Sequence, residues 1–230
     1  MVSRYSIENA RAGQQHDGGT AASAHAYSTL EVFGEGTVSA AADRATIVLG
    51  VETEKPDLQA ALEENARQIA DIIQALYRMG IPAKNIQTSE YRIEMQYDFV
   101  EGKQVFRGYR VTHMLTITAD RVADTGRIVN EAVTHGANII RSITFSISNP
   151  LAYESQALTL ALRTARFKAE TMATTMGVRI GATPYKVQEL SASTEPIPFY
   201  SAKVMAATTT PIQPGQLTVK ATVRVWYFFA

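Results

Sequence analysis

The stretch TLEVFGEGTVSAAADRATIVLGVETE, residues 29–54, sets the character of the fold. It is rich in valine and isoleucine, carries Gly34 and Gly36 in its first run, and is interrupted by an Ala/Asp/Arg stretch at 41–44. β-Branched residues favour strands, and a short polar interruption marks a turn between them. The segment therefore predicts two strands, which must belong to a sheet.

An amphipathic helix is predicted immediately after these strands. Apolar residues recur at steps of three and four, which places them on one helical face, and the charged residues between them lie elsewhere. Pro56 suits the first helical turn, where a missing N–H costs nothing, and Gly80 supplies the left-handed residue that commonly ends a helix. The predicted inward face comprises Leu58, Leu62, Ala66, Ile69, Ile73 and Leu76.

A long hairpin, a second helix and another strand come next. Residues 88–100 and 104–119 are rich in β-branched and aromatic residues, and Glu101-Gly102-Lys103 between them has the length of a hairpin turn. A helical pattern from Asp120 to Gly136 precedes a strand at 138–148. The order of this half is βαββαβ, which is typical of the split βαβ arrangement, an antiparallel sheet with two helices on one face.

The second half is predicted to hold the longest helix, at 150–176, and two strands, at 185–191 and 216–229. A Pro/Thr/Ala-rich stretch at 193–214 predicts a long surface loop between these strands. The apolar stripe of the helix is narrow and rich in small residues, and it comprises Leu158, Leu162, Ala165, Ala169, Met172 and Met176.

The chain is predicted to be one α+β domain made of two packed halves, 29–148 and 149–230, after a flexible segment at 1–28. Met79-Gly80-Ile81 ends the first long helix as Met176-Gly177-Val178 ends the second, and strands follow each. This similarity indicates an internal repeat, with a long helix and a hairpin in the second half. The repeat by itself indicates no chemistry.

The charge balance argues against several kinds of partner. The 230 residues carry 22 Lys and Arg against 22 Asp and Glu, so charge alone attracts neither nucleic acid nor anionic lipid. Nothing approaches the roughly 20 consecutive apolar residues of a membrane-spanning helix. We therefore expect no nucleic acid partner and no membrane span. The location is expected to be cytoplasmic if Met1 is the native start, and the periplasm or cell surface if a leader was removed.

The sequence offers no recognisable catalytic, cofactor or metal site. Cysteine is absent, which excludes thiolate nucleophiles and Cys-ligated metals. The four histidines lack the spacing of metal ligands, and His113 and His135 fit a strand position and a helix end better than a catalytic base. Gly34-Glu35-Gly36 lacks the third glycine of a nucleotide loop, because Ser39 stands there, and no Gly-x-Ser-x-Gly elbow occurs. Catalytic residues, cofactors and metals are predicted to be none, and the protein is predicted not to be an enzyme.

Aromatic side chains supply the candidate interaction residues. Tyr91, Tyr97 and Phe99 occupy odd positions and therefore lie on one face of their strand. The terminal strand is apolar on both faces near its end. Aromatics are enriched in cores and in interfaces alike, so both interpretations stay open. The candidate interface comprises Tyr97, Phe99, Phe106, Tyr109, Trp226 and Phe228.

A set of short patterns across residues 30–229 resembles the SIMPL-domain family, a domain of unknown function. Each pattern is weak alone, since glycines occur at turns everywhere, and their shared order and spacing carry the resemblance. The first are Gly34-Glu35-Gly36-Thr37-Val38, Gly80-Ile81 followed by Asn85-Ile86-Gln87-Thr88-Ser89, and Gly108-Tyr109-Arg110-Val111. The others are Gly136-Ala137-Asn138, Gly177-Val178-Arg179-Ile180-Gly181 and Thr210-Pro211-Ile212-Gln213-Pro214-Gly215.

The resemblance implies an α+β fold and bacterial relatives that are mostly exported, some forming large rings and some linked to oxidative-stress tolerance. It implies no catalytic residue, because none is established for the family. The leading hypothesis is a non-enzymatic, self-assembling interaction or stress-related module that forms a homo-oligomer. A further possibility is a stress-protective or signalling adaptor that binds an unidentified protein partner. The alternative is a small-ligand-binding protein or enzyme whose pocket lies between the two halves.

Overall fold

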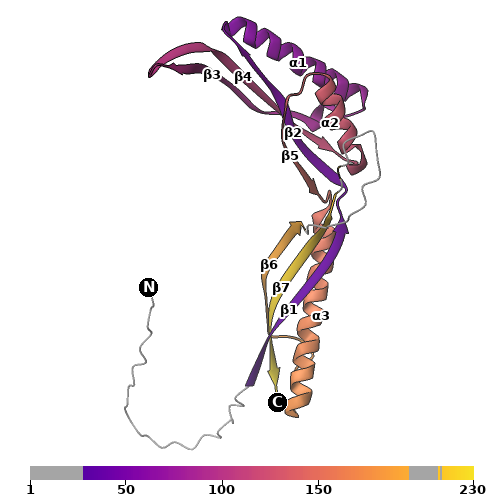
Figure 1. Ribbon diagram of the computed structural model, residues 1–230. Helices are drawn as coiled ribbons and strands as arrows, with labels where there is room; N and C mark the ends of the chain where they lie inside the picture. The colour runs from indigo at the N-terminus through magenta and orange to yellow at the C-terminus, as the bar shows by residue number, and fades with distance from the viewer. Residues whose placement is uncertain (1–27, 197–211, 213) are drawn as a thin grey trace, which may run out of the picture.

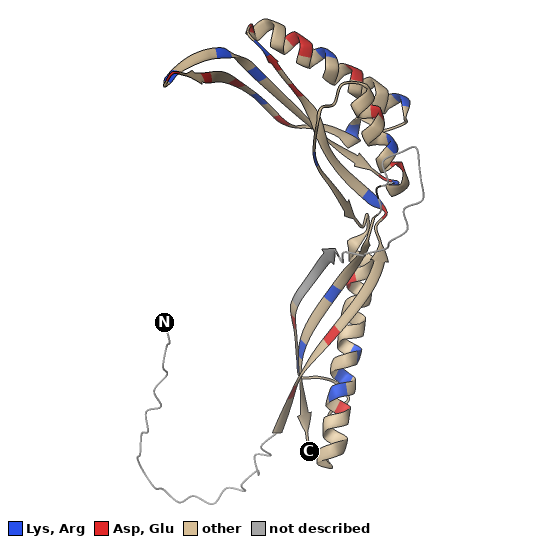
Figure 2. Ribbon diagram, viewed as in Figure 1, with Lys and Arg blue, Asp and Glu red and all other residues tan. Residues whose placement is uncertain are grey.

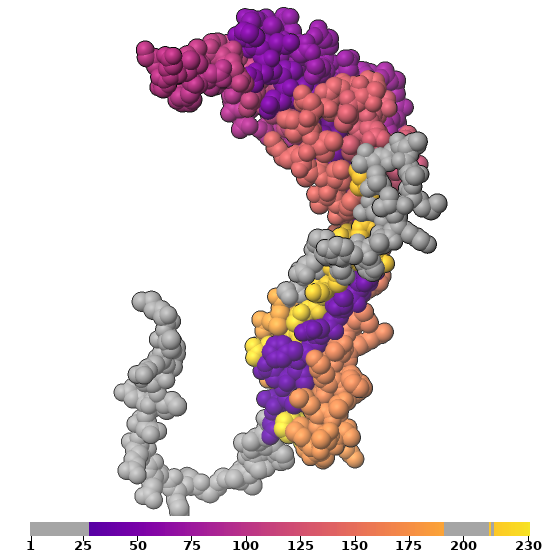
Figure 3. Space-filling view, viewed as in Figure 1, coloured from indigo at the N-terminus to yellow at the C-terminus, as the bar shows by residue number. Residues whose placement is uncertain are grey.

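The computed structural model describes residues 28–196, 212 and 214–230. Over these residues the protein has three α-helices and seven strands, and the strands form two antiparallel sheets. This confirms the predicted α+β class. The sheets belong to two lobes placed end to end, so the molecule is elongated (Figure 1, Figure 3). The expectations for residues 1–27 and for most of the 193–214 loop fall outside the described residues.

The first lobe has the topology of the predicted split βαβ sheet. Its strands lie in the order β3-β4-β2-β5, and all neighbours are antiparallel. Short 3-10 turns precede β3 and α2. The elements are β2 (Arg44–Lys55), α1 (Leu58–Arg78), β3 (Ile86–Val100), β4 (Lys103–Ala119), α2 (Thr125–Thr134) and β5 (Ile139–Ser146). Both helices share one core with the sheet, formed by Ile47, Leu49, Ile72, Leu76, Leu115, Ile117 and Ile128 among others.

The buried face of α1 is rotated from the predicted one. Ile69 and Leu76 are buried as expected, but Leu58, Leu62 and Ala66 are not. Steps of three and four describe two neighbouring stripes about equally well, and the buried one contains a polar residue that a hydrophobicity pattern passes over. The buried residues are Ala61, Asn65, Ile69, Ile72, Ala75 and Leu76.

Asn65 is the polar residue in this stripe, and it joins the helix to two strands. Its Nδ2 donates to the main-chain oxygen of Val51 on β2, at 3.2 Å, and to that of Val111 on β4, at 3.1 Å. A buried amide is tolerated where hydrogen bonds replace those lost to water. Asn65 therefore fixes the position of α1 over the sheet.

The second lobe is a three-stranded sheet covered on one face by α3 (Pro150–Met176). Its strands are β1 (Ser28–Ala41), β7 (Gln216–Phe229) and β6 (Lys186–Pro196), in the order β1-β7-β6. The structure adds β1 to the long helix and two strands predicted for this half: β1 pairs with β7 along its whole length. β6 extends to Pro196 and so includes the start of the predicted loop. The internal repeat stays a prediction.

α3 buries a stripe of alanines at intervals of four, which contains the predicted Ala165 and Ala169 but not the predicted leucines and methionines. Met172 and Met176 are exposed, and Leu162 is only partly covered. The reason lies on β1, where Gly34 and Gly36 let the helix approach the strand more closely than larger residues permit. An added Cβ would lie 2.0 Å from the Ala161 oxygen at Gly34 and 1.9 Å from the Ala157 oxygen at Gly36. The buried stripe is Ala157, Ala161, Ala165, Ala169 and Ala173.

A carboxylate ties together two of the connections between the lobes, the one that leads from β1 to β2 and the one from β5 to α3. Asp43 Oδ1 accepts from the Ser148 N–H and Oδ2 from the Ser148 hydroxyl, each at 2.6 Å. The Asp43 N–H donates to the Ser146 oxygen at 3.2 Å. The hydrogen bond from the Ser148 hydroxyl holds the pKa of Asp43 below its ordinary value.

Candidate functional site

The β3–β4 hairpin forms an arm that projects from the first lobe. We call residues 91–109 the hairpin arm. Pairing of β2 with β4 ends at Lys55 and Tyr109, whereas β3 and β4 continue to pair up to Val100 and Lys103. The outer part of the arm is therefore a two-stranded ribbon, and it reaches beyond the other elements of the lobe (Figure 1).

One face of the hairpin arm is aromatic and largely open to solvent. Tyr97 packs edge-on against Phe106, with ring centroids 5.8 Å apart, and Phe106 packs edge-on against Tyr109 at 5.1 Å. Phe99 is 74% exposed, and Tyr97 and Phe106 are 43% and 45% exposed. The structure thus brings together the four candidate residues predicted in this hairpin, on a surface rather than in a core.

A β-bulge explains why Phe106 and Tyr109 share that face. Residues three apart on a regular strand point to opposite sides. Here Gln96 pairs with Gly108 and Tyr97 with Phe106, so Arg107 is an extra residue that reverses the alternation. Simple counting along the sequence does not reveal this.

Two further members of the aromatic face, Ile93 and Met95, were missed at the level of sequence. Both lie on β3 between Tyr91 and Tyr97, and they are 44% and 58% exposed. The signal that would have found them is the strict two-residue period from Tyr91 to Phe99. The patch therefore covers five successive same-face positions of β3.

The opposite face of the arm is charged, and its charges are paired. Arg107 contacts Glu54 and Asp98, and Arg110 contacts Glu52 and Glu54. Burial acts to raise the pKa of Glu54, but hydrogen bonds from Arg107 and Arg110 outweigh it and lower that pKa. Figure 2 shows both signs of charge interspersed along the hairpin. The two faces of the arm thus differ sharply in polarity.

The remaining candidates, Trp226 and Phe228, lie in the second lobe, on the sheet face opposite α3. Trp226 is half-buried, and its Nε1 donates to Glu31 Oε2 at 3.0 Å. The same carboxylate accepts from Arg224 Nε at 2.5 Å, and the Arg224 guanidinium lies 4.8 Å from the Trp226 ring centroid. Phe228 stacks on Tyr185 at 4.3 Å. The structure therefore separates these two residues from the hairpin arm.

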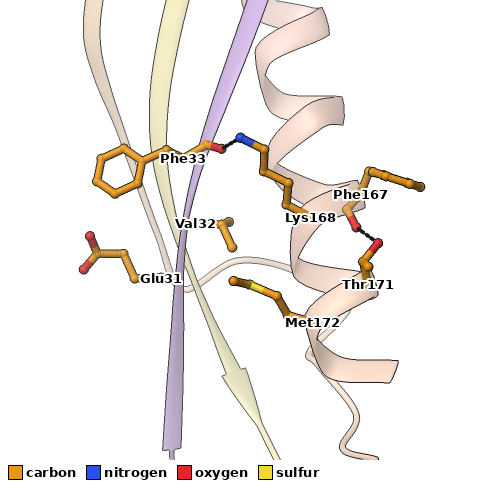
Figure 4. A pocket seen from close by; sticks show the side chains of 7 residues that line it. All are labelled: Glu31, Val32, Phe33, Phe167, Lys168, Thr171 and Met172. Carbon is orange, nitrogen blue, oxygen red and sulfur yellow. Dashed lines mark hydrogen bonds between the residues drawn. The ribbon is translucent and has the colours of Figure 1, made fainter. Parts of the chain in front are cut away.

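An apolar groove lies between the edge strand β1 and α3, and no sequence signal singled it out (Figure 4). Its volume is about 360 Å³. Lys168 crosses from the helix to the strand, where its Nζ donates to the Phe33 oxygen at 2.9 Å. Phe167, Thr171 and Met172 line the helical side. We call this feature the β1–α3 groove; Glu31, Val32 and Phe33 line its strand side.

The histidines weighed as catalytic bases are engaged in structural contacts. His113 Nε2 lies 3.0 Å from the Thr88 hydroxyl, and the ring packs edge-on against Tyr91. Burial lowers the pKa of His113, so the ring is neutral at pH 7. His135 Nδ1 lies 2.8 Å from the Glu131 main-chain oxygen at the end of α2. Among the described residues, no group of three or more His, Asp or Glu side chains is placed to hold a metal ion.

Within the part of the chain that the structure describes, no helix is both long enough and apolar enough to cross a membrane.

Comparisons with known proteins give one consistent result. Residues 30–227 match the model of the SIMPL family, described as "Protein of unknown function (DUF541)". The chain is 28% identical over 207 residues to the "26 kDa periplasmic immunogenic protein" of Brucella melitensis, covering 85% of this chain and 82% of that protein. It is 25% identical over 191 residues to "Uncharacterized protein YggE" of Escherichia coli K12, covering 83% and 76%.

Proposed function

The chain belongs to the SIMPL family, and from that premise we propose that it is a non-enzymatic protein that binds copies of itself through the hairpin arm. The observation that carries the proposal is the solvent-exposed aromatic face of the arm, from Tyr91 to Phe99 with Phe106. Exposed contiguous apolar surface marks interaction sites, and Tyr, Phe and Met are enriched in the cores of interfaces.

The surroundings of the arm support a contact surface rather than a catalytic one. Its charged face is occupied by ion pairs of Arg107 and Arg110 with Glu52 and Glu54. His113, the nearest histidine along β4, is neutral and contacts Thr88. A catalytic site needs polar groups that converge on a substrate, whereas these groups satisfy one another.

Replacing Phe99 and Phe106 together by serine is expected to reduce the assembly to the 25.1 kDa monomer. Central aromatic residues of an interface often contribute about 2 kcal/mol or more each, so the pair is expected to weaken association about a thousandfold. Size-exclusion chromatography with light scattering over a range of concentrations measures the mass. Circular dichroism checks that the variant remains folded, which is expected because Phe99 is largely exposed and Phe106 is about half exposed on the arm, outside the core.

Leu151→Ser is the matched control for that change. Leu151 is 72% exposed on the first turn of α3, in the other lobe, and lies outside the patch. Its replacement removes exposed apolar surface away from the arm and should leave the mass unchanged. A wild-type chain that stays monomeric at high concentration would contradict the proposal outright.

The alternative function, a small-ligand binder or enzyme, finds its best support in the β1–α3 groove. The volume of about 360 Å³ lies within the range of small-molecule sites. Ligand sites also need polar groups that converge on the ligand, yet Glu31 is engaged by Arg224 and Trp226. The groove also lies within one lobe rather than between the halves. The geometry therefore favours the interaction module.

The periplasm is the compartment we propose for this protein. The name of the Brucella relative places that protein in the periplasm, and it is similar to this chain over most of both lengths. Of the two locations that the sequence left open, this similarity favours export. Release of the protein from its native cells by osmotic shock, with a cytoplasmic enzyme retained as control, is the expected result. Retention with the cytoplasmic enzyme would exclude this compartment.

A further inference from the structure

We infer that the β1–α3 groove receives the hairpin arm of a second copy of this chain. The inference rests on the proposed self-association and names the surface that the arm contacts. Both surfaces are apolar and exposed, and they belong to different lobes. A contact between them therefore joins unlike surfaces of two copies.

The groove offers apolar contacts at the edge of the second lobe. Phe167, on the helical side, is 70% exposed, the largest exposure of any described aromatic side chain except Phe99. Met172 lies five residues further along α3 and is also exposed, and the buried Val32 lies between strand and helix (Figure 4). A flexible thioether adapts readily to an aromatic partner. The groove thus matches the aromatic face of the arm in chemistry.

Both surfaces include a strand edge that pairs with no other strand among the described residues. β1 is an edge strand whose only described partner is β7, and the Phe33 oxygen points outward to Lys168. On the arm, the part of β4 before Tyr109 pairs with β3 alone. A strand edge presents N–H and C=O groups that bind another strand. The arm can therefore lie along β1, with Lys168 at the point of contact.

Charges at the two surfaces are complementary. Within the described residues, Lys168 beside the groove pairs with no carboxylate, and Glu101 and Lys103 at the tip of the arm pair with no opposite charge. Glu101 lies in the turn that joins β3 to β4. An acid at the tip of the arm and a base beside the groove attract each other and set the direction of docking. We assign this pairing to Glu101 and Lys168.

A contact between unlike surfaces can be tested by complementation. In such an assembly the arm of each copy binds the groove of the next copy, which gives a ring or a filament. Each copy therefore uses one arm and one groove. The double substitution Phe99→Ser and Phe106→Ser removes the apolar contact surface of the arm. The double substitution Phe167→Ser and Met172→Ser removes that of the groove, and it changes only exposed side chains. Each double variant alone is expected to be monomeric. An equimolar mixture is expected to contain a species of twice the monomer mass and nothing larger, because only one intact arm and one intact groove remain.

The outcomes separate this inference from the function it rests on. If the groove variant keeps the wild-type mass while the arm variant is monomeric, the arm mediates self-association through another surface and this inference fails alone. A mixture that stays monomeric also overturns it. Binding of an apolar dye gives a further check: a groove variant that loses only dye binding and keeps the wild-type mass overturns the inference as well. A monomeric wild type overturns both.

Charge reversal gives an independent test of orientation. Glu101→Lys and Lys168→Glu are each expected to weaken association up to about fivefold, and the combination is expected to restore it, because an exposed ion pair contributes up to about 1 kcal/mol. Lys103→Glu serves as the control on the same turn, and sedimentation equilibrium measures the dissociation constants. Effects that add in the combined variant, with no recovery, would exclude the Glu101–Lys168 pairing.

Discussion

Replacing Gly36 by alanine is expected to destabilise the second lobe by about 3 kcal/mol, the upper end of the usual cost of overpacking. The new Cβ would lie 1.9 Å from the Ala157 oxygen and 2.5 Å from the Ala161 nitrogen. Both obstacles are main-chain atoms of α3, so no side-chain rotation relieves the contact. The helix must move away from β1, and the whole alanine stripe then loses its packing on the sheet.

Urea unfolding followed by circular dichroism measures the free energy of unfolding of this variant. Hydrogen exchange shows which lobe is destabilised, because the amides of β7 should lose protection while those of β2 keep it. Gly181→Ala is the matched control in the same lobe: its nearest neighbours, the Thr183 and Phe228 oxygens, lie 3.4 and 3.7 Å from an added Cβ. It should change stability by less than about 0.5 kcal/mol. Equal stability of the Gly36 variant and the wild type would mean that α3 does not pack this closely on β1.

The sequence pattern predicted the elements well because most of them obey a local rule. α3 begins with Pro150 at its first turn and ends before a left-handed Gly177, and both its limits were predicted from these residues. The final strand was likewise predicted at its observed limits, from the alternation of Val and Ala with polar residues. The packing partners of these elements were not predictable in the same way. The pairing of β1 with β7 joins residues nearly 200 positions apart, and no local pattern specifies it.

The faces of the helices were harder to predict than the helices themselves. A stripe of alanines against glycines buries little apolar surface per residue, so hydrophobicity favours the neighbouring leucines and methionines of α3 instead. Close approach explains the true stripe only when β1 is placed beside the helix. In the same way, the aromatic residues of the hairpin were predicted as candidates, but their exposure depends on where β2 ends and their shared face depends on the bulge at Arg107.

The substitution Asn65→Asp tests the other unexpected feature of the fold, a polar residue in the buried face of α1. Asn65 is 1% exposed, and its Nδ2 faces two main-chain oxygens. Aspartate has nearly the same shape but places a carboxylate oxygen where the donor was. Burial without a partner raises the pKa of such a carboxyl by about 3 units or more, so the cost at neutral pH is expected to be about 4 kcal/mol.

This cost has a defined pH dependence. The carboxyl introduced at position 65 has a higher pKa in the folded than in the unfolded chain, where it is about 4. The stability of the variant is therefore closest to that of the wild type below about pH 4. The difference from the wild type then grows as the pH rises through the folded pKa. Protonated aspartate can still donate to one of the two oxygens, whereas ionised aspartate repels both. Urea unfolding of variant and wild type at matched pH values measures the difference.

Two control variants separate charge from the loss of hydrogen bonds. Asn65→Leu also removes the donor but adds no charge, so its cost of about 2 kcal/mol should not depend on pH. Asn138→Asp makes the same chemical change at an exposed amide that donates to the Glu52 oxygen and accepts from the Glu52 N–H, each at 2.8 Å. Water solvates the new charge there, and the expected cost is below about 1 kcal/mol. If Asn65→Asp and Asn138→Asp cost the same, Asn65 is not the buried link between α1 and its two strands. A large, pH-dependent cost at Asn65 alone means that this one amide holds α1 in register with the sheet. The hairpin arm extends from that same sheet.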